Sequence, residues 1–461
     1  MAVQCPFIRI EDERLPHRDL RVWAPGRSIR RPTDHQSKRP VPTFPVVRRW
    51  RKNDGVVARG AEISVMRQSP GSAEPPVAYL MKNDSHDISG VMMGRPHPPV
   101  LGVIIGITPG ETTSELEYAK AVRAQALGVN TLTDVTTNDD RTLRRRILET
   151  LDISCGTVPT YEIHRRIRRR GENSRSAVLG VLEEQAKEGV DFVTIHASGT
   201  REMALRLDAA TRAIPVTSRG GAMMVEVTRQ MGEENPYLAN FDDVLDICAA
   251  HGMALSLAGT YRPGSIADAL DRTHLDEVRE QAELVRRAQA RGVKVSVELV
   301  NHVPLHLIPV YCELGAAELH GAPFGALGPT PTDIGIGYDD VVGAIGAVAA
   351  AQHGTSWITC VTAGEHCHMP TIDDMEQAVK YFQISLHIAA ISRHGDVSRD
   401  AKLSEARNRN DWAAMADLAI HRDDAVSMFD RLGYHEGQAC TMCSGACPLV
   451  RTTAEIRRAP R

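Results

Sequence analysis

Runs of apolar residues alternate with amphipathic stretches from about residue 100 to residue 390. The amphipathic stretches have the period of helices and include Glu115–Leu127, Ala177–Glu188, Phe241–His251, Leu275–Arg291 and Ile372–Ile391. The apolar runs have the length of strands: Val100–Ile107, Asn130–Thr136, Gly156–Tyr161, Phe192–Ala197, Ile214–Ser218, Met253–Gly259, Lys294–Val300, Pro323–Leu327 and Trp357–Thr362. Strands that alternate with helices predict a parallel sheet.

Most of these strand candidates are continuously apolar, which is typical of strands buried on both faces. We therefore predict an α/β fold, a (β/α)8 barrel over residues 91–370. Nine candidates exceed the eight strands required, so Ile214–Ser218 is expected to be a loop or an extra strand. An open doubly wound sheet is the alternative, but the glycines near Gly106 lack the spacing of a phosphate-binding turn.

The two ends of the chain differ from the barrel region. After residue 370 the pattern is wholly helical, which predicts a small helical domain over residues 371–461. Residues 1–90 are expected to form an irregular, partly disordered extension, with a basic, proline-containing arm at 17–60. The arm is interpreted as a poorly ordered tail, with a targeting peptide or a nucleic-acid tail as alternatives.

Composition narrows the class of protein. The 461 residues carry a net charge of -4, so we expect no nucleic acid as a partner of the whole molecule. No run approaches the length of a membrane helix, so no membrane association is expected. Nine cysteines and the lack of an apolar signal at the start favour a reducing, cytoplasmic location.

Polar residues recur where the predicted strands end. Because the carboxyl ends of parallel barrel strands share one mouth, these residues predict an active site there. A single member such as His196 fits a structural or a catalytic role equally well. The set comprises Tyr161, His196, Ser218–Gly221, Arg262–Ser265, Glu298 with His302, Thr332–Asp333, and Glu365–His366.

These residue types suggest specific chemistry. Ser218, Arg219, Gly220 and Gly221 combine a hydroxyl, a guanidinium and accessible backbone amides, which suits a phosphate or carboxylate. Arg262 is a second candidate anion ligand, or part of a turn before a helix. Glu298 is a candidate general base or acceptor for substrate hydroxyls.

Two histidines at strand ends are candidate metal ligands. Neutral imidazoles bind zinc or iron(II), so His302 and His366 are expected either to bind such an ion or to hydrogen bond to backbone or carboxylates.

Three cysteines lie within eight residues near the C-terminus: Cys440, Cys443 and Cys447. Three thiolates suit a [4Fe–4S] cluster with one open iron, whereas structural zinc normally takes four protein ligands. A zinc knuckle completed by His435 and a redox pair are the alternatives. Next to a barrel that binds an anion, an open iron suggests reductive cleavage of S-adenosylmethionine.

Eight ordered motifs between about residues 90 and 450 resemble the phosphomethylpyrimidine synthase family. They are Gly156–Pro159, Thr194–Ala197, Ser218–Gly221, Arg262–Ser265, His302–Pro304, Leu327–Pro329 with Thr332–Ile334, Gly337–Asp339, and Val361–Thr362 with Glu365–His366. Members are radical S-adenosylmethionine lyases that convert 5-aminoimidazole ribonucleotide to the pyrimidine of thiamine. The resemblance implies the same reaction class, a phosphorylated small-molecule substrate, an external electron donor, and a homodimer in which the cluster domain serves the partner's barrel.

The resemblance also assigns roles to residues. It implies that Cys440, Cys443 and Cys447 hold the cluster and that His302 and His366 bind zinc or iron(II). It further implies substrate contact by Tyr161, His196, Ser218, Arg219, Gly220, Gly221, Arg262 and Glu298, with Glu298 and His196 as catalytic candidates.

The chain departs from the family at several positions. The second interval between its cysteines is one residue shorter, and four substrate-contacting positions occupied in the family by Asn, Met, Asp and Tyr read Ile104, Thr133, Gly259 and Gly325. Such changes predict an altered substrate. The alternatives are a paralogue with another product, such as 5-hydroxybenzimidazole, a regulatory relative without activity, and a zinc-dependent barrel hydrolase with a structural zinc knuckle.

Overall fold

The computed structural model describes residues 77–207, 211–443 and 446–452. The basic arm predicted at residues 17–60 lies outside these residues, as do Ser444 and Gly445 of the cysteine loop.

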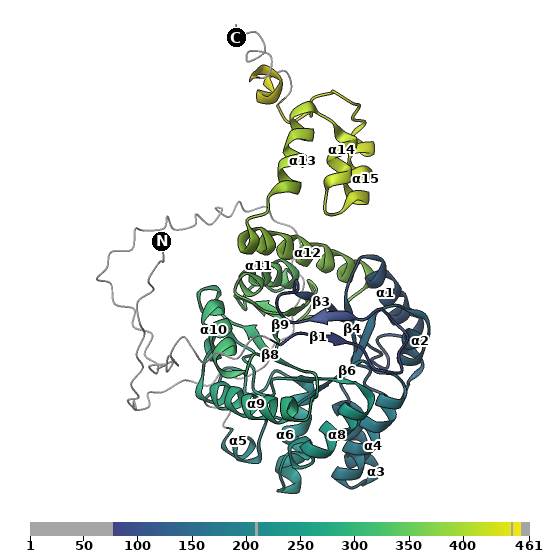
Figure 1. The fold of residues 1–461 in the computed structure, drawn as a ribbon, viewed down its shortest axis with the longest axis vertical. Coiled ribbons are helices and arrows are strands. Elements are labelled where there is room, and N and C mark those ends of the chain that lie inside the picture. The colour runs from purple at the N-terminus through teal and green to yellow at the C-terminus, as the bar shows by residue number, and fades with distance from the viewer. Residues whose placement is uncertain (1–76, 208–210, 444–445, 453–461) are drawn as a thin grey trace, which may run out of the picture. The chain divides into compact units, whose positions relative to one another are not determined.

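Eight parallel strands close into a barrel in the order β10-β3-β4-β5-β6-β7-β8-β9 (Figure 1). The predicted (β/α)8 barrel is therefore confirmed, and the doubly wound alternative is wrong. The strands are β3 (Val100–Ile105), β4 (Thr131–Asp134), β5 (Ser154–Thr157), β6 (Phe192–Ile195), β7 (Ala254–Leu257), β8 (Val295–His302), β9 (Phe324–Thr330) and β10 (Trp357–Thr359).

The ninth candidate, Ile214–Ser218, is a loop. Pro215 removes a backbone donor from this run, and Ser218 is the N-cap of the helix that follows. The predicted strand Gly156–Tyr161 ends early, at Thr157, because Pro159 introduces a helix that starts at Thr160. Tyr161 therefore projects from the first turn of a helix rather than from a strand end.

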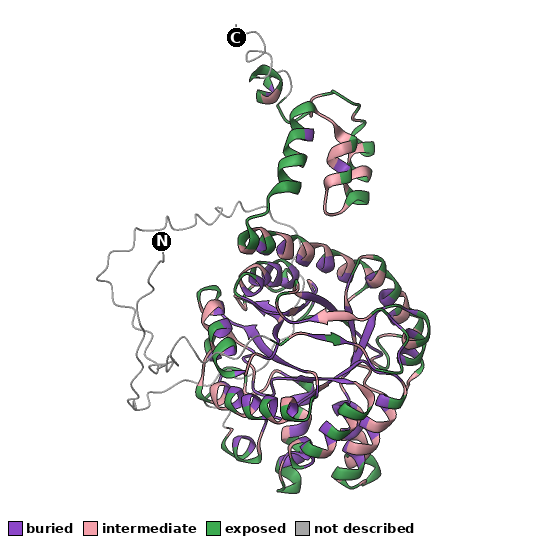
Figure 2. Ribbon diagram, viewed as in Figure 1, coloured by how far each residue is buried: buried purple, intermediate pink, exposed green. Residues whose placement is uncertain are grey.

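Helices surround the barrel and bury their apolar faces against the strands (Figure 2). They are α1 (Ser114–Ala126), α2 (Thr142–Thr150), α3 (Thr160–Arg170), α4 (Ser174–Lys187), α5 (Arg201–Arg206), α6 (Arg219–Met231), α7 (Pro236–Ala239), α8 (Phe241–His251), α9 (Arg272–Ala290), α10 (Ile308–Glu318), α11 (Asp339–Gln352) and α12 (Ile372–His394).

A short antiparallel hairpin lies at the amino ends of the barrel strands. It consists of β1 (Tyr79–Met81) and β2 (Val91–Met93), and it starts inside the region predicted as the N-terminal extension. Met81 and Met93 pack in one apolar cluster with Val100 and Phe192, the first residues of β3 and β6. The hairpin thus covers the end of the barrel opposite the predicted mouth.

Three further helices follow α12: α13 (Ser398–Arg409), α14 (Trp412–Leu418) and α15 (Arg422–Leu432). The helix α13 is largely exposed and buries only Ala406, whereas α14 is mostly half-buried (Figure 2). Lys380 on α12 donates to Asp424 on α15 at 2.9 Å. The cysteine loop comes directly after α15.

None of the helices within the described residues has the length and apolar character that crossing a bilayer requires.

Candidate functional site

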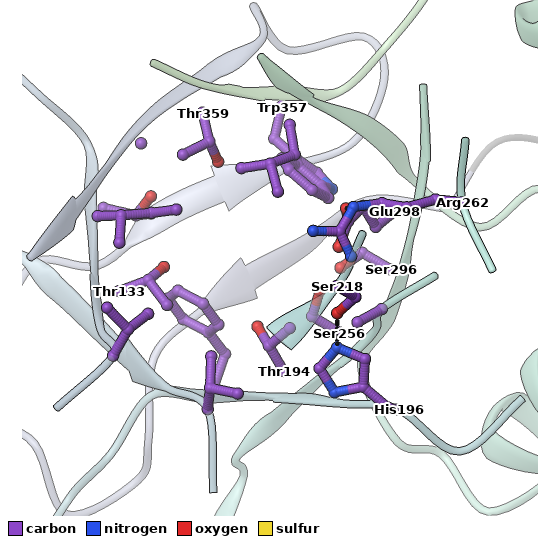
Figure 3. Close-up of a pocket in the computed structure, with 18 of the residues that line it drawn as sticks. Thr133, Thr194, His196, Ser218, Ser256, Arg262, Ser296, Glu298, Trp357 and Thr359 are labelled. Carbon is purple, nitrogen blue, oxygen red and sulfur yellow. Dashed lines mark hydrogen bonds and ion pairs between the residues drawn. The ribbon is translucent and has the colours of Figure 1, made fainter. Parts of the chain in front are cut away.

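A cavity of about 290 Å³ occupies the barrel interior and opens at the carboxyl ends of the strands (Figure 3). Its lining includes Tyr161, His196, Ser218, Arg219, Arg262 and Glu298, together with Glu365. The structure therefore brings these seven residues, all singled out in the sequence, to one cavity, although they come from different parts of the barrel.

His196 follows β6 and is held on both ring nitrogens. Its Nε2 lies 2.6 Å from Ser218 Oγ, the contact drawn in Figure 3, and its Nδ1 lies 3.4 Å from Thr160 Oγ1. Burial, reinforced by the nearby Arg262 charge, lowers the pKa of His196 to about 3. The imidazole is therefore neutral near pH 7.

The amino end of α6 faces this histidine. Ser218 caps the helix by accepting from the Gly221 amide at 3.1 Å, so its own proton is available for His196 Nε2. A β-carbon on Gly220 would lie 2.4 Å from His196 Cε1, and one on Gly221 would lie 3.0 Å from Thr260 Cα. The two glycines are thus required for the helix end to approach the strand ends.

Arg219 begins α6 and lies against Tyr161 from α3. Its Nε donates to the Tyr161 hydroxyl at 3.1 Å, and its guanidinium carbon is 4.8 Å from the centre of the ring. This contact positions a positive charge beside the amino end of a helix, an arrangement that suits an anion.

Arg262 and Glu298 form an ion pair inside the cavity. Arg262 Nε is 2.9 Å from Glu298 Oε1, but the two atoms do not have hydrogen-bond geometry. Arg262 also donates to the carbonyl of Gly259 at 2.9 Å. Burial raises the pKa of Glu298, and the Arg262 charge opposes that rise. Both partners therefore retain hydrogen-bonding capacity for a ligand.

Glu277 on α9 holds the backbone that precedes Arg262, a role that the sequence analysis did not predict. Its side chain is fully buried and accepts from the amides of Thr260 at 2.6 Å and Tyr261 at 2.7 Å, and from the Ser198 hydroxyl at 2.9 Å. It thereby joins the loops that follow β6 and β7. The available signal was a carboxylate on the apolar face of an amphipathic helix.

His302 and His366 lie together, with ring centres 5.2 Å apart. His302 Nδ1 is 2.8 Å from Asp333 Oδ1, and His366 Nδ1 is 3.0 Å from Asp339 Oδ1. Burial lowers the pKa of His302, which favours the neutral, ligating form. Carboxylates at Nδ1 orient histidines so that Nε2 can bind a metal ion.

The donor set is small, because no group of three or more His, Cys, Asp or Glu side chains among the described residues is arranged to hold a metal. A metal at His302 and His366 would need further ligands from water or substrate. The residues present fit such an ion, since a carboxylate contacts Nδ1 of each ring and leaves Nε2 for the ion.

The cysteine loop is anchored to the C-terminal helices. Trp412 of α14 stacks on Tyr434 and donates from Nε1 to the carbonyl of Gln438 at 3.0 Å. Cys440, Cys443 and Cys447 are free thiols, of which Cys447 is buried and Cys443 is exposed. The three thiols are not gathered around one point within the described residues, so it is their spacing in the sequence that suggests a cluster.

The four positions that depart from the family lie around the cavity. Ile104 and Thr133 line it, whereas Gly259 and Gly325 make room for other side chains. A β-carbon on Gly259 would lie 2.9 Å from Arg262 Cβ, and one on Gly325 would lie 2.0 Å from the Trp357 ring. At these two positions the missing β-carbon therefore leaves space for Arg262 and for the Trp357 ring.

Comparison with known proteins identifies the family. The model described as the radical SAM ThiC family matches residues 73–454. Phosphomethylpyrimidine synthase from Methanocaldococcus jannaschii is 33% identical over 378 residues, which cover 80% of this chain and 89% of that protein. The enzyme of the same name from Thermus thermophilus is 36% identical over 349 residues, covering 74% and 80% respectively.

Proposed function

Because the chain belongs to the radical SAM ThiC family, we propose that it is a radical S-adenosylmethionine carbon–carbon lyase. Its substrate is 5-aminoimidazole ribonucleotide or a related phosphorylated small molecule. The product is the pyrimidine of thiamine or a close analogue. The observation that carries the proposal is the cavity in which the amino end of α6, Arg262 and Glu298 meet, inside a chain whose relatives are phosphomethylpyrimidine synthases.

The substrate's phosphate binds at the amino end of α6. Arg219 supplies a charge there, and Ser218 caps the helix through the Gly221 amide, which leaves the other amides of the first turn for the anion. Tyr161 holds Arg219 in place. The anion is thereby fixed on one side of the cavity, so the rest of the substrate extends toward Glu298.

Glu298 and His196 handle protons next to the substrate. Glu298 has a raised pKa, so its carboxyl group accepts or returns a proton more readily near neutral pH than an exposed glutamate. Neutral His196 forms a hydrogen bond with the Ser218 hydroxyl at Nε2 and offers no competing positive charge. Arg262 orients the carboxylate through the 2.9 Å ion pair.

Cys440, Cys443 and Cys447 would hold a [4Fe–4S] cluster, and His302 and His366 would bind zinc or iron(II). When bound, the cluster would pass on an electron from an external donor for the reductive cleavage of S-adenosylmethionine. The barrel itself orients the substrate and excludes bulk water. The β1–β2 hairpin closes the end of the barrel opposite the mouth, which helps to keep water out.

We also infer a homodimer in a reducing, cytoplasmic compartment. All eight cysteines among the described residues are free thiols. Ile384 and Ile388 on α12, and Met428 and Leu432 on α15, remain exposed in the single chain. Exposed apolar residues on neighbouring helices favour contact with a second copy.

The test uses anaerobically reconstituted protein with dithionite, S-adenosylmethionine and 5-aminoimidazole ribonucleotide. We expect 5′-deoxyadenosine and a phosphorylated pyrimidine. With the cluster verified spectroscopically, absence of both products would overturn the proposal. A colourless protein that contains zinc, rather than roughly four irons per chain, would favour the zinc hydrolase instead.

A paralogue with another product is the second candidate, and the replaced cavity positions favour it. Ile104 presents an apolar side chain to the cavity, with 37% of its surface exposed. In the same assay, 5′-deoxyadenosine without the pyrimidine would support this candidate, and detection of 5-hydroxybenzimidazole would identify one such product.

A further inference from the structure

A chain of hydrogen bonds runs from the interior between α3 and α7 to the mouth of the cavity. The Tyr237 hydroxyl on α7 lies 3.0 Å from Thr160 Oγ1 on α3, and Thr160 Oγ1 lies 3.4 Å from His196 Nδ1. On the other side of the ring, His196 Nε2 lies 2.6 Å from Ser218 Oγ (Figure 3). Tyr237 and Thr160 are fully buried, and neither lines the cavity. The chain thus connects two buried hydroxyls to the candidate anion site.

The surroundings keep the members of this chain in place. The side-chain amide of Asn235 donates to the carbonyl of His196 at 2.8 Å, and its Oδ1 accepts from the Tyr237 amide at 3.0 Å. Asn235 is fully buried and therefore holds α7 against the end of β6. The ring of His196 also lies against Gly220, where an added β-carbon would be 2.4 Å from Cε1. The ring and the phenol thus keep fixed positions on either side of Thr160.

The buried phenol determines which groups donate along the chain. Ser218 donates to His196 Nε2 only if that nitrogen carries no proton, so the far side of the ring decides. Burial raises the pKa of Tyr237 far above its usual range, so the phenol keeps its proton. Thr160 is its hydrogen-bond partner within the described residues, and a buried proton without an acceptor is costly. Tyr237 therefore donates to Thr160, which leaves the proton of Thr160 for His196 Nδ1.

The positions of the remaining protons follow from this order. A neutral imidazole that accepts at Nδ1 carries its proton on Nε2 and donates it to Ser218 Oγ. Ser218 Oγ also accepts from the Gly221 amide at 3.1 Å, so both of its lone pairs are used. The Ser218 proton is then free to point into the cavity. The reverse order would leave the proton of Tyr237 or of Thr160 buried without an acceptor.

We propose that Thr160 and Tyr237 are positioning residues, which fix the His196 tautomer with its proton on Nε2 and thereby turn the Ser218 hydroxyl proton toward a bound anion. This assignment rests on the proposed function, in which the phosphate of the substrate binds at the amino end of α6. It deepens that function by adding a hydroxyl donor to Arg219 and the backbone amides. A ligand with a hydrogen-bond donor in place of the anionic oxygen would be rejected, because two donors would face each other.

The first experiment observes the tautomer by nitrogen-15 NMR of the imidazole rings in the full-length, anaerobically reconstituted protein. The signal of His196 is assigned by its loss in His196→Gln. We expect that Nε2 carries the proton near pH 7 and that Nδ1 is an acceptor. A ring with its proton on Nδ1 in the unmodified protein would overturn the proposal.

Variants that lack one hydroxyl test the two positioning residues. Tyr237→Phe and Thr160→Val should each shift the tautomer ratio of His196 roughly 2- to 10-fold toward the form protonated on Nδ1, the effect of one lost hydrogen bond. Thr160→Ser keeps the hydroxyl and should retain the original tautomer. Tyr311→Phe is the control, because Tyr311 is fully buried and its hydroxyl accepts from the Leu270 amide at 2.8 Å, away from the chain. An unchanged His196 spectrum in either Tyr237→Phe or Thr160→Val would contradict the proposal.

The second experiment titrates inorganic phosphate into the same proteins by calorimetry. Tyr237→Phe should weaken phosphate binding roughly 2- to 10-fold, because the Ser218 proton is no longer held toward the anion, and Tyr311→Phe should not. A changed tautomer with unchanged phosphate affinity would overturn the link between the chain and the anion. Failure of the unmodified protein to bind phosphate would instead refute the anion site of the proposed function, while the NMR spectra still decide the tautomer.

Discussion

At the scale of single residues, the packing of the site requires a glycine at position 220. Gly220 lies against the ring of His196, which is fixed by Ser218 on one nitrogen and by Thr160 on the other. The ring therefore has little freedom to move aside, so any larger residue at position 220 must displace either the ring or the start of α6.

We accordingly predict that Gly220→Ala destabilises the protein by roughly 1–3 kcal/mol, as overpacking does, and weakens phosphate binding. Denaturant unfolding and calorimetry measure the two effects. Gly180→Ala in α4 is the matched control, because its β-carbon would meet only the end of the Arg166 side chain at 3.3 Å. Gly180→Ala should leave the free energy of unfolding unchanged or raise it by about 0.5–1 kcal/mol. Equal stability of the two variants would contradict the close contact.

Glu277 is a second residue that shapes the site, although it does not line the cavity. It accepts hydrogen bonds from the two amides just before Arg262, those of Thr260 and Tyr261, and from the Ser198 hydroxyl. A glutamine side chain would set its NH2 donor against one of these donors. We predict that Glu277→Gln costs roughly 1–3 kcal/mol of unfolding free energy. Glu283→Gln, on the exposed side of the same helix, should stay within about 0.5 kcal/mol.

The cost should depend on pH with a definite sign. Burial raises the pKa of Glu277 from its ordinary value of 4.5 to about 7, although its three donors lower it. A carboxyl group whose pKa is higher in the folded than in the unfolded protein stabilises the fold fully at pH values below its unfolded-state pKa. That contribution is lost as the pH rises through its folded-state pKa. The difference in unfolding free energy between wild type and Glu277→Gln should therefore become smaller as the pH rises from about 5 to about 8. Urea titrations over that range measure it, and a widening gap would refute the assignment.

At the scale of elements, the loops after β7, β8 and β9 are joined through Asp333. One carboxylate oxygen contacts His302 at 2.8 Å, and the other accepts from Ser265 Oγ and the Ile266 amide, both at 2.9 Å. Asp333 thus ties the orientation of the candidate metal ligand to the loop that carries Arg262.

If His302 binds a metal, Asp333→Asn should lower zinc affinity by about 10- to 100-fold, the usual effect of losing a carboxylate behind a ligating histidine. Competition with a zinc chelator measures the affinity. Ser265→Ala is the control, since it removes one donor to Asp333 but keeps the carboxylate on His302. Unchanged affinity in Asp333→Asn would argue that this histidine does not bind the ion.

The sequence predicted all eight barrel strands because their burial on both faces leaves continuous apolar runs. It did not separate Ile214–Ser218 from them, since an apolar loop that packs over a barrel has the same composition as a short strand. Tyr161 was assigned to a strand end for a related reason: the turn at Pro159 lies inside one apolar run. Local patterns specify the type of an element better than its ends.

At the scale of the whole molecule, the cysteine loop and the barrel form separate parts of one chain. In the residues that the structure describes, the hydrogen bonds of the loop are to its own neighbours and to the C-terminal helices, through Trp412 and Asn410. A homodimer in which each loop serves the partner's barrel, as the family resemblance implies, makes a strong prediction for mixed variants.

Coexpressed Arg262→Ala and Cys443→Ala chains should regain activity that neither has alone. In each mixed dimer one of the two sites combines a wild-type barrel with a wild-type loop, so the purified mixed dimer should have about half of the wild-type activity. Tandem affinity purification isolates the mixed dimer, and 5′-deoxyadenosine formation measures its activity. Two co-purified Arg262→Ala chains with different tags are the control and should stay inactive. An inactive mixed dimer would mean that each loop serves its own barrel.

The sequence by itself determined the barrel, the set of polar residues at its mouth and the family, because each is written in local order: periodicity, strand-end residues and short motifs. The tertiary structure alone decided which residues touch. The contacts of Glu277 and the Asp333–His302 pair join elements far apart in the chain, and whether Gly325 accommodates the Trp357 ring depends on the register of β9 and β10. Contacts between the strands of a closed barrel depend on how distant segments pack in three dimensions, and a local sequence pattern does not predict that packing.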